Sequence, residues 1–405
     1  MTEPLTSSVV VPRQRDRRGA DDAEPAGTPT PARSARARWA GPLAAILGYA
    51  VLRGISIVAL AIEAHHRGKH LSDGLLRADA GWYSMIAQHG YAHVLTYGAD
   101  GLPNPVNLAF FPLFPALVAV FAWALPISAS TATIVVAWAG GLFAASGLYA
   151  VGTAVKDRRT GVLLAMLWAV VPSAQVQSMG YSETLFTALS AWSLWAVLRG
   201  RWLTAAGFCL LAGLTRPTAA ALIAAVGLAA LVAVIRNPRQ WRPWVAGFIS
   251  PLGLLGFMAW VSLRLHRLDG YFYVQNVAWN MKFDGGAETL HWASRVIFHR
   301  LALSFTVTTA VLATGVILLL VAIGGRIPWP LLVFAGVALI VVLTGDGYYW
   351  AKARLLMPAF PLLLPVALAL SRTRNRVTPV AVIGGLTALS AVYGIYLSLI
   401  WNHSP

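Results

Sequence analysis

The sequence of 405 residues is poor in charge. Charged residues make up 11% of it and hydrophobic residues 58%, whereas about a quarter of a soluble domain is charged. Windows of about 20 apolar residues recur along almost the whole chain, which is the pattern of transmembrane helices. The composition therefore excludes an ordinary soluble domain and predicts an all-α polytopic membrane protein.

Cysteine is almost absent, and the one that occurs, Cys209, lies inside an apolar run. A single cysteine cannot form a disulfide within the chain and excludes a cysteine-based metal site. The nine histidines do not fall in metal-ligand spacings, and no P-loop or Rossmann glycine pattern occurs. We therefore expect no metal, no nucleotide and no other cofactor.

Acids are scarce relative to bases, with 15 Asp and Glu against 31 Lys and Arg, which gives a net charge of +16. The basic residues are spread over the ends of apolar runs, where such residues orient helices and contact anionic lipid headgroups. No basic and aromatic soluble module accompanies them. We expect membrane lipids, and no nucleic acid, among the partners of this chain.

Two regions follow from the distribution of apolar residues. Residues 1–38 carry seven arginines and no apolar period, which predicts a disordered, basic, cytoplasmic tail. Residues 39–405 form the transmembrane domain. Its first apolar run covers 40–63, and polar segments predicted to face outward cover about 64–107, 264–300 and 345–352.

The number of spans is predicted as eleven or twelve. After the first run, apolar runs lie near 108–127, 131–155, 160–177, 181–198, 202–218, 219–235, 243–263, 301–323, 327–344, 353–370 and 378–401. Basic clusters at 199–201, 236–242, 324–326 and 371–376 indicate cytoplasmic connections. The cluster at 156–159 also indicates the cytoplasm, which requires an odd number of crossings after the first outer loop. Two apolar runs, 108–127 and 131–155, lie between that loop and the cluster. Either one run, most readily the proline-broken 108–127, is not a full crossing, or this cluster lies outside.

The acids of the membrane domain gather on the predicted outer face. Apart from Asp157, all of them fall in outer loops or at outer helix ends: Glu63, Asp73, Asp79, Asp100, Glu183, Asp269, Asp284, Glu288 and Asp346. Ionisable groups at membrane depth are costly and point to function. The polar chemistry of the chain is therefore expected on one side of the membrane.

Asp79 is the leading candidate among these acids. It lies in "RADAGWYSMIAQHGY", residues 77–91, beside Arg77 and ahead of Trp82 and Tyr83. The segment predicts a short amphipathic helix at the membrane surface, with Trp82 and His89 on one face. Asp79 is either a general base or simply an N-cap of this helix, and the residues alone leave both open.

Three further motifs carry polar groups toward the same side. In "MGYSETLF" Tyr181 and Glu183 open an apolar run, although Ser182 and Glu183 also fit a helix start. Arg216, in "LTRPT", is either a guanidinium clamp for a phosphate or a cation that reaches lipid headgroups. "DGYYWAKARLLMPAFP" brings Asp346, Lys352 and Arg354 to a helix start, where an aromatic belt is the alternative explanation.

Five motifs in order along the chain resemble those of the PIG-V-type mannosyltransferases, bacterial relatives of the second mannosyltransferase of GPI-anchor synthesis within the GT-C class. They are residues 77–91, "NLAFFPLFP" (107–115), "QSMGYSETLF" (177–186), "LTRPT" (214–218) and "ARLLMPAFP" (353–361). The resemblance covers about residues 40–365. One departure is Ala78, where the family usually has tryptophan before its catalytic acid.

The resemblance implies a GT-C-like bundle with interfacial helices in the first outer loop and an active site facing outward from the bacterial plasma membrane. It implies mannosyl transfer, with inversion, from a polyprenyl-phosphate sugar to a glycan or lipid-glycan acceptor, and it places the catalytic acid at Asp79. The residues expected to bind the substrates are Arg77, Trp82, Tyr83, His89, Tyr181, Glu183, Arg216, Asp346, Lys352 and Arg354. A lipid or solute transporter and a non-catalytic subunit of a glycan-assembly complex are the rival functions.

Overall fold

The computed structural model describes residues 31–405, with side chains from Trp39 onward. The chain divides into two units, Met1–Trp39 and Ala40–Pro405, and the packing described below belongs to the second. The tail predicted to be disordered covers residues 1–38. Of these, residues 1–30 lie outside the described residues. Residues 31–38 belong to helix α1, which begins at Pro31.

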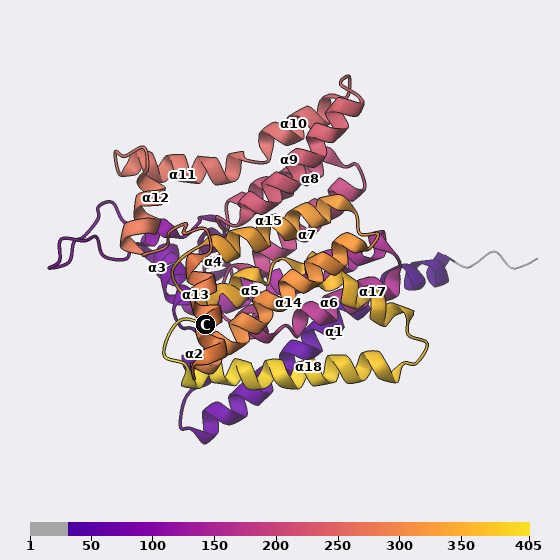
Figure 1. Ribbon diagram of the computed structural model, residues 1–405, viewed down its shortest axis with the longest axis horizontal. Coiled ribbons are helices and arrows are strands. Elements are labelled where there is room, and N and C mark those ends of the chain that lie inside the picture. The colour runs from indigo at the N-terminus through magenta and orange to yellow at the C-terminus, as the bar shows by residue number, and fades with distance from the viewer. Residues whose placement is uncertain (1–30) are drawn as a thin grey trace, which may run out of the picture. The chain divides into compact units, whose positions relative to one another are not determined.

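The described residues form helices and two isolated β-bridges but no strand. The α-helices, labelled in Figure 1, are α1 (Pro31–His66), α2 (Leu71–Leu75), α3 (Asp79–His89), α4 (Leu113–Ala124), α5 (Ala129–Val155), α6 (Arg158–Ala169), α7 (Glu183–Leu198), α8 (Trp202–Gly213), α9 (Ala219–Arg236), α10 (Trp241–Ile249), α11 (Leu252–Arg264), α12 (Gly270–Tyr273), α13 (Ala287–Phe298), α14 (Leu303–Gly324), α15 (Trp329–Thr344), α16 (Lys352–Leu356), α17 (Leu364–Arg372) and α18 (Val377–Ile395). Short 3₁₀ turns include η2 (Pro172–Ser178) and η4 (Tyr349–Ala351), and a π-turn, η6 (Tyr396–Ile400), follows α18.

The prediction of an all-α polytopic membrane fold is confirmed, but the number of spans differs from the predicted eleven or twelve. Six segments among the described residues are long and apolar enough to cross a membrane, and two bent pairs of helices raise this to eight. The bends measure 86° between α6 and η2 and 74° between the segments 349–356 and 360–372. Four apolar helices, α4, α7, α8 and α15, are shorter, which accounts for the larger number expected from hydropathy.

The contacts of the basic cluster 156–159 show at which end of the helix bundle it lies. Lys156 Nζ donates to Ser371 Oγ at 2.8 Å, and Arg159 donates to Thr373 at 3.4 Å. This cluster and the basic cluster 371–376 therefore lie at the same end of the bundle. Helix α4 has 12 residues, about 18 Å at 1.5 Å per residue, which is too short for a hydrocarbon core of about 30 Å. Helix α4 alone is therefore too short for a full crossing, and the side of the membrane on which the cluster 156–159 lies stays a prediction.

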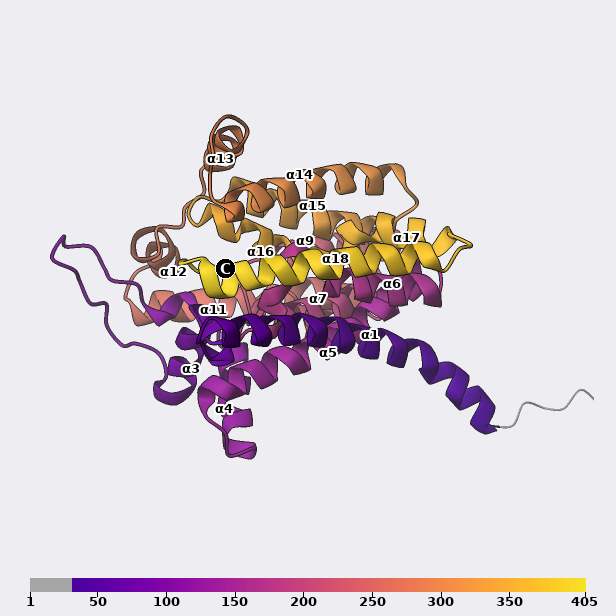
Figure 2. The same cartoon turned by 90° about the horizontal axis from the view of Figure 1, so that it is seen from below.

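Close helix packing around α5 fixes the middle of the bundle. A Cβ atom at Gly152 would lie 2.6 Å from the Cα atom of Gly161 on α6, and one at Gly140 would lie 2.9 Å from the backbone nitrogen of Leu185 on α7. Small residues permit such approach between membrane helices. Helix α7 is almost entirely buried in consequence, and Figure 2 shows it surrounded by other helices.

The break between α6 and α7 is supported by a buried arginine on α1. Arg53 is fully buried; its guanidinium donates to Ser178 Oγ at 2.9 and 3.1 Å and to Gln175 Oε1 at 3.2 Å. Irregular backbone at membrane depth occurs where it is buried in protein and its polar groups find partners. Arg53 thus holds the turn η2, from which the chain continues into Tyr181, Ser182 and Glu183.

We predict that single cysteines at positions 159 and 374 react from the same side of the membrane, opposite to a cysteine at 100. The reason is that 156–159 and 371–376 share one end of the bundle, whereas α5, of 27 residues or about 40 Å, separates them from the 64–107 loop. The measurement is labelling of Arg159→Cys, Arg374→Cys and Asp100→Cys in intact cells with a membrane-impermeant maleimide. The parent chain, whose Cys209 is buried, is the control, and labelling of 100 and 159 together from outside would contradict the placement.

Candidate active site

Four segments from distant parts of the sequence bring charged side chains together. They are the first residue of α3, the start of α7, the turn between α8 and α9, and the short helix α16. The side chains are Asp79, Glu183, Arg216 and Arg354, two of each sign. All four were predicted to belong to the site, and the structure brings them into one connected network.

Asp79 begins this network at the first position of α3. Its Oδ2 atom lies 3.1 Å from Nη1 of Arg354. Burial raises the pKa of the Asp79 carboxyl above its usual range, and the neighbouring Arg354 guanidinium opposes this rise. The N-cap position belongs to Ala78, not to Asp79, so the carboxylate is turned toward the arginine instead of closing its own helix.

The backbone before Asp79 is strained. Ala78 has φ of 50° and ψ of −110°, a conformation that residues with a Cβ atom seldom adopt. Such strain costs about 1–3 kcal/mol and persists where the surrounding structure imposes it. Here the strained residue immediately precedes the carboxylate, and it directs α3 so that Asp79 reaches Arg354.

Glu183 joins the two arginines. Its side chain is fully buried, with Oε1 at 2.8 Å from Arg216 Nη1 and 3.4 Å from Arg354 Nε. The arginine side chains are also mostly buried, 11% and 10% exposed. A carboxylate and guanidiniums withdrawn from water are stable only when they compensate one another. Glu183 therefore sets the spacing and orientation of both guanidinium groups.

Hydroxyl and aromatic groups complete the network. Ser182 Oγ accepts a hydrogen bond from Arg216 at 3.2 Å and shares another with the Tyr83 hydroxyl at 2.8 Å. The ring of Tyr181 lies under the Arg354 guanidinium, 5.0 Å from ring centre to Cζ, a cation–π contact. Ser182 was expected only as a helix cap; the motif "YSE" placed it beside Glu183, but its partners could not be known from the sequence.

Trp82 is part of an aromatic group beside the first turn of α3. It stacks on Phe110 with ring centres 5.7 Å apart and meets Trp279 edge-on at 5.4 Å. Trp279 belongs to the predicted outer loop 264–300, which therefore contacts the helix that carries Asp79. Neither Phe110 nor Trp279 was singled out from the sequence, because aromatic residues are common in interfacial loops.

Lys352 and Asp346 lie in a second cluster rather than in the network of Asp79. Lys352 is buried and contacts Glu288 at 3.0 Å, the Thr289 hydroxyl at 2.7 Å and the carbonyl of Gly345 at 2.6 Å. Asp346 accepts from the backbone nitrogen of Gly347 in the adjoining turn. This cluster attaches α13 to the segment before α16, with Lys352 two positions ahead of Arg354.

Arg77 and His89 have other surroundings. Arg77 donates to the carbonyl groups of Leu397, Ser398 and Trp401 at 2.8 to 3.2 Å, so it holds the end of the chain beside the start of α3. His89 is exposed at the opposite end of α3 from Asp79. Among the described residues no group of three His, Cys, Asp or Glu side chains forms a metal site.

The arrangement of helices has counterparts among solved structures. The fold is similar to that of GT-C membrane glycosyltransferases. One such structure is that of ArnT from Cupriavidus metallidurans bound to undecaprenyl phosphate. Its TM-score is 0.55 and its sequence identity 15%, and the match covers 89% of this chain and 66% of ArnT. No protein-family model and no curated protein matches the sequence.

Two further structures are more distant. ArnT in the apo state has a TM-score of 0.46 and 13% identity, over 86% of this chain and 75% of that protein. The oligosaccharyltransferase AglB from Archaeoglobus fulgidus, in complex with an inhibitory peptide and a dolichol-phosphate, has a TM-score of 0.42 and 16% identity, over 86% and 55%. The chain thus spans about two thirds of the ArnT structure with the higher score and about half of AglB. The GT-C-like fold implied by the predicted resemblance agrees with the similarity to the ArnT structure of TM-score 0.55, and the PIG-V part of the resemblance stays a prediction.

We predict that Glu183→Gln lowers the stability of the protein by about 3 kcal/mol or more, because removing one member of a buried charge network leaves the others uncompensated. The measurement is thermal unfolding of the purified protein in detergent. The matched control is Glu63→Gln: Glu63 pairs with Arg67 at 2.6 Å, but on the surface, where such a pair contributes at most about 1 kcal/mol. Equal unfolding temperatures for the two variants would show that Glu183 does not hold the network together.

Proposed function

We propose that this protein is a membrane glycosyltransferase that moves a mannosyl residue from polyprenyl-phosphate mannose to a glycan or lipid-glycan acceptor on the outer face of the bacterial plasma membrane. The observation that carries the proposal is the pairing of Asp79 with Arg354 in a network that also holds Arg216. It places a carboxylate that can accept a proton beside guanidinium groups that can hold a phosphate.

Asp79 is assigned the role of general base. In the proposed step an acceptor hydroxyl oxygen attacks the anomeric carbon of the donor, the bond from that carbon to the phosphate oxygen breaks, and the hydroxyl proton passes to the carboxylate. Arg354 contacts Oδ2, which leaves Oδ1 to take the proton. Attack opposite to the leaving phosphate inverts the configuration of the anomeric carbon.

Arg354 and Arg216 are assigned to the leaving group. The bond that breaks leaves its electron pair on the polyprenyl phosphate, and fixed cations stabilise such developing charge. Guanidinium groups suit this role because their planar donors match phosphate oxygens. Glu183 is a positioning residue in this scheme, because it holds both guanidiniums without contacting the reacting atoms.

The similarity of the fold and the setting of the site on membrane helices both support a polyprenyl-phosphate sugar as the donor. The fold is similar to that of ArnT, whose structure contains undecaprenyl phosphate, and a lipid-linked donor suits a site built on membrane helices. The preference for mannose rests on the resemblance of the five sequence motifs to PIG-V-type enzymes. Trp82, which is partly exposed beside the first turn of α3, is suited to contact the sugar through its ring face. Tyr83 and Tyr181 are buried, and they support the network through Ser182 and Arg354.

We predict that membranes containing the wild-type chain transfer label from polyprenyl-phosphate mannose, and that Asp79→Asn lowers the rate by at least about 100-fold, the lower end of what a general base contributes. The measurement is radiolabel in the glycan fraction of washed membranes. Asp100→Asn is the matched control, because Asp100 is an exposed acid in the same loop and its contact with the backbone nitrogen of Leu102 is one that asparagine can keep.

The outcomes separate the rival functions. Equal transfer by wild type and Asp79→Asn, with both proteins present in the membrane, would remove Asp79 from the mechanism and agree with a non-catalytic subunit. Absence of transfer by the wild type, together with saturable uptake of a lipid or solute by vesicles, would favour a transporter.

We also predict that the transfer rate falls on acidification at a pH above that of an ordinary aspartate, whose pKa is about 4. Burial raises the pKa of Asp79, and the base works only when deprotonated, so activity is lost as the pH falls through this raised value. The negative charge of Glu183 contributes to the rise. The acid limb of kcat/KM should therefore move to lower pH in Glu183→Gln, and a limb at the same pH in both proteins would contradict the assignment.

A further inference from the structure

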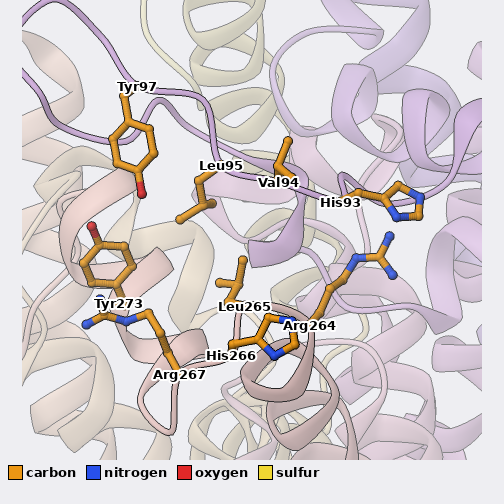
Figure 3. Close-up of a pocket in the computed structure, with 9 residues that line it drawn as sticks. All are labelled: His93, Val94, Leu95, Tyr97, Arg264, Leu265, His266, Arg267 and Tyr273. Carbon is orange, nitrogen blue, oxygen red and sulfur yellow. The ribbon is translucent and has the colours of Figure 1, made fainter.

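A cleft of about 330 Å³ lies beyond the opposite end of α3 from Asp79. Figure 3 shows residues of two parts of the chain that line it, the segment after α3 and the stretch from the last residue of α11 to the last residue of α12. Its polar lining residues are His93, Tyr97, Arg264, His266, Arg267 and Tyr273. No acid lines the cleft, and its volume is at the lower end of the range of small-molecule sites.

Arg264 gives the cleft a fixed positive charge. Its Nε donates to the carbonyl of Ala92 at 2.8 Å and its Nη2 to that of Tyr91 at 3.1 Å. These bonds orient the guanidinium but do not neutralise it, because carbonyl groups carry no net charge. A guanidinium held in this way has donors and charge left for a phosphate or a carboxylate. Figure 3 shows it beside the ring of His93, which adds a further donor.

Arg267 plays a different part. Its guanidinium makes two hydrogen bonds of 3.1 Å to Asp269, which neutralises it, and lies 4.0 Å from the ring centre of Tyr273. It therefore orients Tyr273 instead of supplying charge. The hydroxyl groups of Tyr97 and Tyr273 point toward each other across the cleft (Figure 3). Phenol rings and hydroxyls so placed suit the faces and hydroxyl groups of a sugar.

The cleft is continuous with the helix that carries the proposed base. Its wall at 93–97 follows α3 after Gly90, and Arg264 fixes the intervening residues Tyr91 and Ala92. Helix α3 has 11 residues, about 16 Å. A ligand seated in the cleft and reaching Asp79 must therefore be longer than a single sugar ring.

We propose that this cleft binds the acidic portion, a phosphate or a carboxylate group, of a saccharide. Arg264, His93 and His266 contact the anion, and Tyr97 and Tyr273 contact the sugar that carries it. Only the identification of this saccharide as the acceptor rests on the proposed function; the binding site itself does not. The acceptor class is then an acidic oligosaccharide or its lipid-linked form.

The test is equilibrium binding of three probes to the full-length protein in lipid nanodiscs: phosphorylated mannotriose, unphosphorylated mannotriose and inorganic phosphate. We expect the phosphorylated trisaccharide to bind at least tenfold more tightly than either of the others. The double variant His93→Gln/His266→Asn should lose at least fivefold of that affinity. Asparagine is chosen at 266 because φ is 52° there, a region that asparagine tolerates.

The double variant His65→Gln/His66→Gln is the matched control, because it removes two exposed histidines outside the cleft and should bind as the wild type does. Tyr273→Phe should weaken the phosphorylated trisaccharide but not inorganic phosphate. Equal affinity for all three probes, or equal loss in both histidine pairs, would overturn the proposal. Phosphate binding as tight as that of the phosphorylated sugar would overturn its saccharide part.

The experiment is independent of catalysis. Its readout is equilibrium binding, which requires no transfer of the mannosyl residue. Probe binding without mannosyl transfer would contradict the proposed function and leave the cleft proposal standing. Mannosyl transfer without binding of the phosphorylated trisaccharide would contradict the cleft proposal and leave the proposed function standing.

Discussion

The contact on which the site depends is that of the buried Glu183 carboxylate with Arg216 and Arg354. Withdrawing each of these ions from water costs several kcal/mol, and the cost is recovered only when opposite charges meet with good geometry. The start of α7, the α8–α9 turn and α16 must therefore come together at one point. Asp79 joins the same group through Arg354, so the placement of α3 follows from the placement of the other three. The strained backbone of Ala78, directly before Asp79, is part of the cost of bringing this carboxylate to Arg354.

Broken helices make that contact possible. A straight helix through residues 158–198 would carry Tyr181 and Glu183 past the site, whereas the 86° bend between α6 and η2 turns the chain so that α7 begins there. The break exposes backbone groups at depth, and Arg53 on α1 fixes it through Ser178 and Gln175. Arg53 has no acid among these partners. Its charge is stabilised in the bundle by hydrogen bonds to these side chains and to the carbonyl of Ala169, the last residue of α6, at 3.5 Å. Fold and site are linked here by one guanidinium far from the chemistry.

The sequence predicted what depends on near neighbours and missed what depends on distant ones. The apolar runs gave an all-α membrane fold, and the pattern after Arg77 gave a short helix starting near Asp79, because both are local properties. The span count was too high, since hydropathy registers α4, α7, α8 and α15 without their lengths. Arg77 and Lys352 were expected at the site on charge and position alone. Their partners are carbonyls some 320 residues later in one case and Glu288 in the other, and partner choice at such separation is decided by packing.

The two proposed sites place recognition and chemistry at opposite ends of one helix, α3. At its first residue α3 carries an acid whose charge is shared with Arg354, so the base and the phosphate-binding cations cannot be altered separately: a change in either charge changes the pKa and orientation of the other. Beyond its last residue the chain forms the wall of the cleft, fixed by Arg264 to backbone carbonyls. The cleft can therefore vary in charge and shape without disturbing Asp79. Acceptor preference in such a protein is free to change through residues 93–97 and 264–273, whereas the network around Glu183 must be kept whole.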